Sequence, residues 1–507
     1  MMPALAAAHE RAESEGYVLV DGQAQSVPAA VSAALKTGSL ADLNGSFAAI
    51  LGDVAVTDRL GSVPVYLAAG RPSFDFWSLA DQQRTLNLDA AAEMLLFGYA
   101  LGDGTLLKEI TEAPPASVII PGREPSRYWR YNVSPSSSSG RQLSSDLAHV
   151  IELIGRNTAT ALKAQGLGRV GLNLTAGRDS RVLAALLRRN SVPFVAYTME
   201  DQLGEHEVAG VLAEQLGVAH FVRPVWRSLP AEAQPIIDQL TPTTMFTVAN
   251  TNLVHAGETR RIDALMSGHL GDVAAGSHLH MSLIVASLAN DRPGLARRAA
   301  AIQTRFDPAI LKPYCTPALA KALDRAVERL VTMYRERDAG ELFGAVTAVD
   351  LEQRQRRFIL RDFHAQRQLG PAIMPFADNA WFDFWTSVPL RWQAYTQLYT
   401  RVLAEHVFTG ELSAFAEIPA NGKRLSVVRL PELETVRSFV SARFRKGSFR
   451  QPDAPRLIDP DRSLDGLADM FDVKRLDRDR ATMPQCVQET LETLALFAEK
   501  ANPTGAM

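Results

Sequence analysis

Residues 170–187 read VGLNLTAGRDSRVLAALL and pass from a short apolar run through a small polar turn into a second apolar segment. The run from Val170 to Leu174 is typical of a buried strand, and Val182 to Leu187 continues as a helix. A strand that opens through such a turn into a helix directs unpaired backbone N–H groups and the positive helix end toward an anion. The stretch predicts a phosphate site, although an ordinary capped helix has the same outline.

The side chains of this turn suit a phosphate and a cation together. Thr175 and Ser180 supply hydroxyl donors, and Gly177 permits close approach of a ligand. Asp179 would repel a bare phosphate unless a cation lies between them. We therefore expect Mg²⁺ to bridge the carboxylate and the phosphate.

The pattern around this stretch predicts α/β architecture. Strands expected at residues 170–174, 194–198 and 220–222 alternate with helices, which indicates parallel β-α-β units, and the chain from residue 284 onward is mainly helical in pattern. The earlier region, residues 16–129, has short β-prone runs between turns and two helical segments, which is typical of an α+β domain. A polar, serine-rich stretch follows it. We predict a first domain at residues 1–131, a linker at 132–145 and a second domain at 146–507.

The composition is that of an ordinary globular enzyme. Apolar residues make up 47% of the 507 residues, and the formal net charge of -3 provides no basic field for nucleic acid. Cys315 and Cys486 are too few for a disulfide framework. The first residues lack the pattern of a secretory signal, and no apolar run is long enough to span a membrane. We expect a soluble, cytoplasmic protein that binds neither nucleic acid nor membranes.

The turn TAGRDS at residues 175–180 resembles the Ser-Gly-Gly-x-Asp-Ser pyrophosphate loop of ATP pyrophosphatases, particularly that of the asparagine synthetase family. Thr175 replaces the first serine and Ala176 the first glycine. Further landmarks of that family occur in the same order, and the second glycine of its Ser-Gly-x-Gly-x-Asp segment is displaced here to Gly271. These landmarks are LNGSF at 43–47, DRLGSVPVY at 58–66, YW at 128–129, SGHLGDVAAG at 267–276, PFAD at 375–378, SVP at 387–389 and PANGKR at 419–424.

The resemblance implies a shortened glutaminase-like α+β domain of the Ntn (N-terminal nucleophile) type, followed by an α/β synthetase domain of the ATP-pyrophosphatase type. It also implies that ATP and Mg²⁺ are the cofactors and that Asp179 and Asp272 hold the metal, although Asp272 also fits a helix cap. The residues that would bind ATP and pyrophosphate are Thr175, Ala176, Gly177, Arg178, Asp179, Ser180, Met199 and Gly268.

Two further residues have catalytic roles if the resemblance holds. Lys423 would stabilise negative charge as an amine attacks an acyl-adenylate, although without the resemblance it is a surface turn lysine. His269 stands where β-lactam synthetases have a tyrosine that helps to deprotonate the amine, and a lone histidine also fits a structural role.

The first domain lacks the nucleophile of a glutaminase. Glutamine-dependent relatives use an amino-terminal cysteine, whereas residues 1 and 2 are methionine here and both cysteines lie far downstream. We therefore expect no glutamine hydrolysis and a nitrogen source other than glutamine. β-Lactam synthetases and lasso peptide cyclases, which use an amine of the substrate itself, are the most similar groups in this respect.

We predict an ATP-dependent ligase that adenylates a carboxylate and couples it to an amine, with macrolactam formation in a peptide as the specific hypothesis. Such an enzyme would belong to natural-product biosynthesis, as lasso peptide cyclases do. Its substrate would be a peptide or a small carboxylate, and its partners would include a protease or a leader-peptide-binding protein. Two alternatives stay open: an amidotransferase that uses ammonia on a small or sugar carboxylate, and a nucleotide-binding scaffold without turnover.

Overall fold

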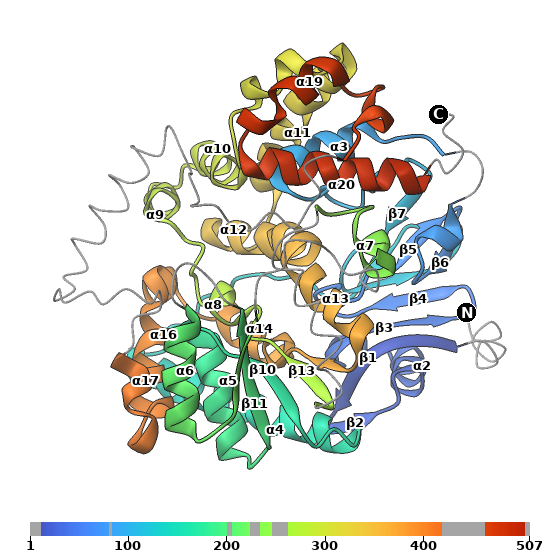
Figure 1. The fold of residues 1–507 in the computed structure, drawn as a ribbon. Helices are drawn as coiled ribbons and strands as arrows, with labels where there is room; N and C mark the ends of the chain where they lie inside the picture. Colours follow the sequence, from blue (N-terminus) through green and yellow to red (C-terminus); the bar gives the residue numbers. More distant parts are fainter. Residues whose placement is uncertain are drawn as a thin grey trace.

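The computed structural model describes residues 12–80, 84–199, 205–223, 234–245, 262–417 and 462–501. Its carboxyl-terminal part contains a five-stranded parallel sheet surrounded by helices, and its amino-terminal part contains antiparallel sheets (Figure 1). The predicted α/β architecture with a parallel sheet is confirmed for the second part, and the first part, predicted as α+β, contains an antiparallel sheet region. None of the helices in the described ranges is both long enough and apolar enough to cross a bilayer.

The parallel sheet has the strand order β12-β11-β10-β13-β14. Its strands have few polar side chains because both faces are covered, and Val170, Leu172 and Ala196 are fully buried. The sheet comprises β10 (Val170–Asn173), β11 (Phe194–Met199), β12 (His220–Arg223), β13 (Ala264–Met266) and β14 (Ala372–Ile373), and its flanking helices include α4 (Gly140–Ala164), α5 (Arg178–Arg189) and α6 (Glu205–Leu216).

The amino-terminal part places one sheet between a helix and a second sheet. Along β3, Phe47 and Ala49 contact helix α2, whereas Ala48 and Ile50 pack with residues of the opposite side such as Val65. This alternation follows from the two-residue repeat of a strand. The larger sheet has the strand order β2 (Gln23–Gln25), β1 (Ala12–Val20), β3 (Asn44–Leu51), β4 (Val54–Thr57), β8 (Ser117–Ile119) and β9 (Ser126–Arg127). The smaller sheet has the order β6 (Arg71–Ser73), β5 (Tyr66–Ala68) and β7 (Ile110–Glu112). Helix α2 spans Val27–Thr37.

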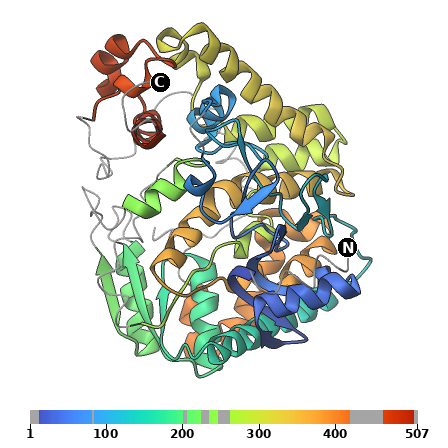
Figure 2. The same ribbon diagram turned by 90° about the vertical axis from the view of Figure 1, so that its right-hand side faces the viewer.

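A helical part lies opposite the parallel sheet, at the top of Figures 1 and 2. Helix α3, from the amino-terminal region, packs on α11 there, so residues far apart in the chain share one core. A continuous helical run crosses the middle of the molecule and includes a π-helical segment. The helices of this part are α3 (Leu88–Phe97), α9 (Met281–Leu288), α10 (Arg292–Gln303), α11 (Pro317–Glu336), α19 (Val473–Asp479) and α20 (Gln485–Ala501). The run through the middle comprises α12 (Leu342–Asp350), the π-helix η9 (Leu351–Ile359) and α13 (Leu360–Leu369). Helices α14 (Asn379–Thr386) and α16 (Gln397–Val402) pack on α4 beside the parallel sheet, and α15 (Leu390–Gln393) packs on α16.

The segment predicted as a linker is held against the carboxyl-terminal end of helix α14. The backbone N–H groups of Ser134 and Ser136 donate to the carbonyls of Thr386 and Ser387, at 2.8 and 2.7 Å. Helix α4 begins at Gly140, inside this segment, because the Ser139 side chain accepts from the backbone N–H of Gln142 and caps the helix. The division into domains at residues 132–145 stays a prediction.

Two of the quoted sequence landmarks meet in space where the sheet regions join. The Asn44 amide donates to Asp378 at 2.9 Å, and the Asn44 carbonyl oxygen accepts from the backbone N–H of Asn379 at 2.8 Å. Asn157 of α4 donates to the same Asp378 carboxylate at 2.7 Å. These residues fasten the antiparallel sheet to the layer that covers the parallel sheet.

Candidate functional site

The strand order of the parallel sheet contains a switch point between β10 and β13. From β10 the chain adds β11 and β12 on one side, whereas β13 and β14 lie on the other side. In open parallel sheets, ligands bind outside the carboxyl ends of the strands at such a point. Leu172 of β10 pairs with Met266 of β13, so the loops that follow these two strands leave the sheet at the same level.

The loop after β10 is ordered by its own hydroxyl groups. Thr175 Oγ1 accepts from the backbone N–H of Gly177 at 2.9 Å, and the Ser180 hydroxyl donates to the Gly177 carbonyl oxygen at 3.1 Å. Ala176 is buried, and it is not among the described non-glycine residues with a positive φ, so alanine fits there without strain. The loop therefore has the tight strand-to-helix geometry that the sequence predicts.

Asp179, in the first turn of α5, is held on both carboxylate oxygens. Tyr399 donates its hydroxyl to Oδ1 at 2.9 Å, and the backbone N–H of Asp272 donates to Oδ2 at 2.8 Å. Burial, and then the charge of Asp272, raise the pKa of Asp179 well above its ordinary value. Burial also raises the pKa of Asp272. Two carboxylates thus share a poorly hydrated site.

The loop after β13 approaches Asp179 through two glycines. A Cβ on Gly268 would lie 3.0 Å from the Asp179 Cβ, and a Cβ on Gly271 would lie 2.4 Å from the carboxyl carbon of Asp179. Leu270, between them, is buried and has a φ of 75°, a conformation that favours glycine. The displaced glycine noted in the sequence thus gives room for the Asp179 carboxylate, while leucine adopts the left-handed turn.

His269 is the side chain of this loop nearest to a further acidic group. Its Nε2 lies 3.7 Å from the Asp362 carboxylate of α13, and burial lowers the pKa of His269 to about 4. The imidazole is therefore neutral at pH 7, and its Nδ1 is buried without a hydrogen-bond partner among the described residues. A neutral imidazole in this position is able to accept a proton.

These loops form one wall of a cleft with a volume of about 440 Å³, within the range of small-ligand sites. The π-helix η9 forms the other wall and contributes Arg354, Gln355 and Ile359. Arg178 also lines the cleft, and its guanidinium donates to Thr396 Oγ1 at 3.0 Å. The cleft thus combines two carboxylates with two arginines from opposite walls.

No protein-family model matches this chain. Nor does any curated protein show significant similarity to it. The assignment of chemistry therefore depends on the residues of the cleft.

The structure brings most of the predicted site residues to this cleft. Ala176 and Met199 do not line it: Ala176 is buried in the loop, and Met199 ends β11, beside β10 in the sheet. The prediction for Lys423 falls outside the described residues. The predicted residues that line the cleft are Thr175, Gly177, Arg178, Asp179, Ser180, Gly268, His269 and Asp272.

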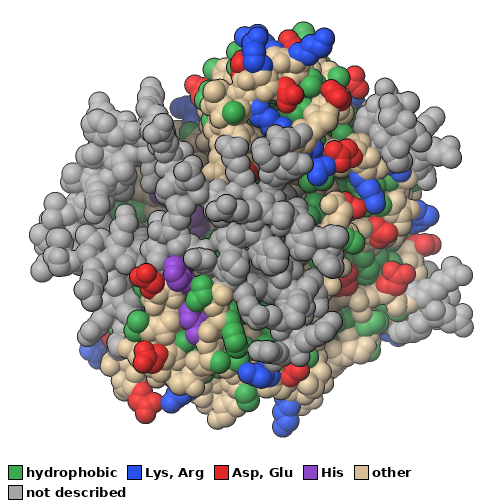
Figure 3. Space-filling model, in the orientation of Figure 1, with side chains coloured by type: hydrophobic (Ala, Val, Ile, Leu, Met, Phe, Trp, Pro, Cys, Tyr) green, Lys and Arg blue, Asp and Glu red, His purple; other side chains and the backbone are tan. Residues whose placement is uncertain are grey.

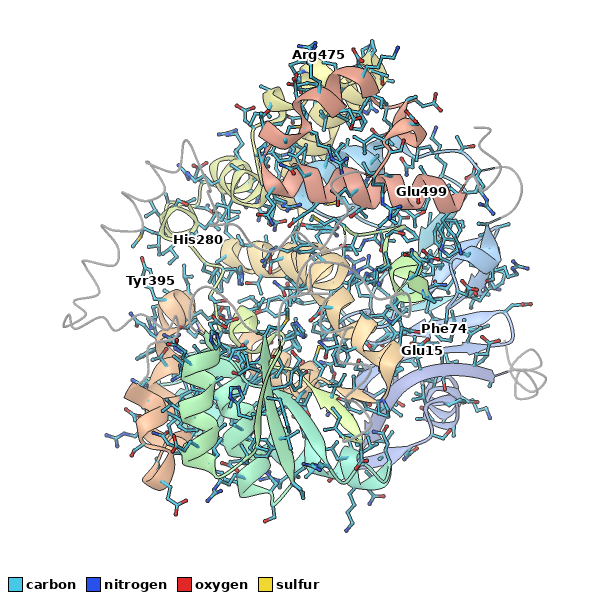
Figure 4. The ribbon with its side chains drawn as sticks, in the orientation of Figure 1. Glu15, Phe74, His280, Tyr395, Arg475 and Glu499 are labelled. Atoms are coloured by element: carbon cyan, nitrogen blue, oxygen red, sulfur yellow. The ribbon has the colours of Figure 1, made fainter. Side chains whose placement is uncertain are left out.

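Three residues of the site carry no sequence motif. Tyr399 and Thr396 come from the segment after α15, more than 200 positions from the loop that they contact, and Arg354 comes from η9. Tyr395 and Thr396 have φ values of 57° and 55°. Strained backbone of this kind concentrates at functional sites and is not visible in a sequence. In Figure 4, Tyr395 and His280 lie on the same flank of the molecule, where the Tyr395 hydroxyl contacts Met281 of α9.

The paired carboxylates fit a magnesium ion. Mg²⁺ is commonly held by one or two carboxylates together with substrate phosphates, and it offsets the repulsion that raises the pKa of Asp179. In the described part of the chain, no cluster of three or more His, Cys, Asp or Glu side chains offers a protein-only metal site. A metal at Asp179 and Asp272 would complete its coordination with oxygen atoms of water or of a substrate.

Proposed function

We propose that this protein is an ATP- and Mg²⁺-dependent ligase that joins a carboxylate to an amine, with the chemistry of the asparagine synthetase family. One observation carries the proposal: at the switch point of the parallel sheet, the carboxylate of Asp179, in the first turn after the β10 loop, accepts from the backbone N–H of Asp272, after β13, so that two acidic residues lie side by side. We also propose that the parallel domain has the ATP-pyrophosphatase fold and that the antiparallel part derives from an Ntn-type glutaminase domain.

The loop and the first turn of α5 would bind the pyrophosphate part of ATP. The first N–H groups of a helix have no partner within the helix, and the helix end carries partial positive charge. Asp179 and Asp272 would hold Mg²⁺, which when bound offsets the charge of the triphosphate and of the leaving pyrophosphate. Arg178 and Arg354 add positive charge on both walls of the cleft.

The reaction would proceed in two steps. A carboxylate oxygen of the substrate attacks the α-phosphorus of ATP, the bond to the β-phosphate oxygen breaks, and pyrophosphate leaves. The amine nitrogen then attacks the acyl carbon, the bond to the phosphate oxygen of AMP breaks, and the nitrogen loses a proton. Enclosure in a cleft favours this second step because the amine is already oriented against the adenylate.

His269 would accept the proton that the amine loses. Burial lowers the pKa of His269 to about 4, so the free imidazole is neutral and a weak base at pH 7, and this role requires the Asp362 carboxylate, 3.7 Å away, to stabilise the imidazolium as it forms. Lys423 would stabilise the charge that develops on the adenylate.

We propose a peptide as the substrate and an intramolecular amine as the nucleophile, so that the product is a macrolactam. The supporting observation is that the amino-terminal part contains no cysteine, because both cysteines, Cys315 and Cys486, lie far downstream of its sheets. Their thiols have pKa values raised by burial, to about 12 at Cys315, which disfavours thiolates. A cytoplasmic location and a precursor-processing partner belong to the same proposal.

The direct test of adenylation is the exchange of labelled pyrophosphate into ATP, with Mg²⁺ and a panel of peptides and small carboxylates. The wild type should catalyse exchange with at least one of them. Asp179→Asn should reduce this exchange by at least about 100-fold, because a metal ligand is lost at the reacting phosphates. Asp263→Asn, at the opposite end of the sheet, should not change it. Exchange by the Asp179→Asn variant at the wild-type rate would refute the role of Asp179, and a nucleotide-bound protein without exchange would favour a scaffold.

The amino-terminal part should not release ammonia from glutamine. With glutamine present, we expect no glutamate above the background of a sample without protein, because no thiolate is available at the sheets. The measurement is an enzyme-coupled glutamate assay, run with and without ATP. Product formed from free ammonia, without a substrate amine, would instead favour the ammonia-using amidotransferase.

A further inference from the structure

An aromatic layer lies directly beneath the candidate metal site. It consists of Trp381 and Trp385 from α14 and Tyr399 from α16, all three fully buried. The ring centroids of Trp381 lie 5.6 Å from those of both Trp385 and Tyr399, at steep interplanar angles. Such edge-to-face packing fixes the orientation of each ring.

Two polar atoms of this layer point at the two loops of the site. The Tyr399 hydroxyl donates to Asp179 Oδ1 at 2.9 Å, and Trp381 Nε1 donates to the carbonyl oxygen of Leu270 at 3.3 Å. The third member, Trp385, has a buried Nε1 without a hydrogen-bond partner among the described residues. The layer therefore contacts each loop through one donor.

Both contacted groups need an external support. Asp179 lies beside Asp272, and the orientation of its carboxylate depends on the donors that hold its two oxygens, the Tyr399 hydroxyl and the Asp272 backbone N–H. Leu270 has a φ of 75°, which a leucine adopts only where the surroundings enforce it. The two donors of the aromatic layer therefore support the Asp179 carboxylate and the turn at Leu270, which lies between Gly268 and Asp272.

We propose that Tyr399 and Trp381 are positioning residues of the metal centre, which fix the Asp179 carboxylate and the Leu270 turn so that the carboxylates of Asp179 and Asp272 both face one cation. This inference rests on the proposed function, because it concerns the same Mg²⁺ site. Neither residue would touch the metal or the nucleotide. Groups that orient metal ligands in this way typically alter metal affinity by 10- to 100-fold when they are lost.

The experiment measures Mg²⁺ binding without turnover. The full chain is titrated calorimetrically with Mg²⁺ in the presence of saturating α,β-methylene-ATP, whose α–β linkage cannot be cleaved. In Tyr399→Phe, the apparent dissociation constant for Mg²⁺ should rise by about 10- to 100-fold. In Trp381→Phe it should rise by a smaller factor, because the lost donor acts on the backbone of the neighbouring loop.

Two matched variants separate positioning from packing. Tyr131→Phe removes a buried hydroxyl that has no described partner, and Trp385→Phe reduces a ring in the same layer whose Nε1 makes no described hydrogen bond. Tyr131→Phe should keep the wild-type Mg²⁺ affinity within about twofold. Trp385→Phe, which packs on Trp381 but donates to neither loop, should lose less Mg²⁺ affinity than Trp381→Phe. Equal losses of Mg²⁺ affinity in Trp381→Phe and Trp385→Phe, with none in Tyr399→Phe, would overturn the inference.

The outcomes also distinguish this inference from the proposed function. If the wild type binds Mg²⁺ with the nucleotide analogue and Tyr399→Phe binds it equally well, the inference fails and the proposed function stands. If the wild type binds neither Mg²⁺ nor the nucleotide analogue, both the inference and the proposed function fail. If Tyr399→Phe does not fold, the Mg²⁺ affinities of Trp381→Phe and Trp385→Phe still test the inference, and equal losses in these two variants would contradict it.

Discussion

Glu112→Gln should destabilise the protein by about 3–5 kcal/mol, the cost of removing one partner from a buried ion pair. Glu112, at the end of β7, faces three buried arginines, Arg356, Arg357 and Arg361. Burial alone would raise the pKa of Glu112, but the charges of Arg357, Arg361 and Arg356 outweigh it and lower this pKa from 4.5 to about 2. Glutamine would remove the one carboxylate that pairs with all three of these buried arginines.

The effect should depend on pH in a defined direction. Because the folded state lowers the pKa of Glu112, the ionised carboxylate stabilises the protein fully above pH 4.5, and this contribution is lost as the pH falls toward 2. The difference in the urea midpoint between wild type and Glu112→Gln should therefore be largest near neutral pH and should shrink in acid.

Asp89→Asn is a suitable control, since Asp89 pairs with Arg325 at the surface, where both side chains are about half exposed. Its loss should cost about 1 kcal/mol or less. Equal destabilisation by the two variants would mean that the arginine cluster is compensated by other groups. The cluster joins β7 to η9 and α13, so its weakening should also loosen the amino-terminal sheets from the central helix.

Gly271→Ala should reduce pyrophosphate exchange by about 100-fold, because misplacing a reacting group by about 1 Å has an effect of this size. The added Cβ would lie 2.4 Å from the carboxyl carbon of Asp179. Asp179 has no free direction in which to retreat, since Tyr399 and the Asp272 N–H hold its two oxygens. The exchange rate, measured with a carboxylate that supports the wild type, reports the displacement.

Gly168→Ala provides the matched comparison. Gly168 precedes β10 at the other end of the sheet, and a Cβ there would make an ordinary contact of 3.5 Å with Asp263. Its exchange rate should equal that of the wild type. A Gly271→Ala variant with full exchange would show that the two loops do not approach each other as closely in solution.

Much of the architecture was predictable because it depends on local pattern. The strands β10, β11 and β12 and the intervening helices follow from short apolar runs that alternate with helical spacing. The strand order was not predictable from these runs, since it requires β13 to pair with β10 rather than with β12. That pairing creates the switch point and therefore the location of the cleft.

The residues of the site also divide into some that the sequence predicts and others that it does not. Thr175, Gly177, Asp179 and Ser180 lie within one turn, so a motif could identify them together. Tyr399 does not belong to a sequence motif. Its role depends on packing between α14 and α16, and a tyrosine among apolar residues normally indicates a position in the core. The nine-residue π-helix, which places Arg354 in the cleft, has no recognisable sequence signal.

The charged side chains on the described surface do not indicate a particular function. On the face shown in Figure 3, acidic and basic side chains of the described residues are interspersed, as expected for a formal net charge of -3.

Asp179 and the Asp272 N–H that binds it are 93 residues apart in the sequence. The entropy of closing so long a loop must be overcome before the contact forms, so the cleft can be assembled only after β13 has docked beside β10. Because the entropy of loop closure grows only slowly with length, a longer connection between the two loops would add little to this cost. Natural variants are therefore free to gain or lose surface segments between the two loops, while the pairing of Leu172 with Met266 keeps the carboxylates in place.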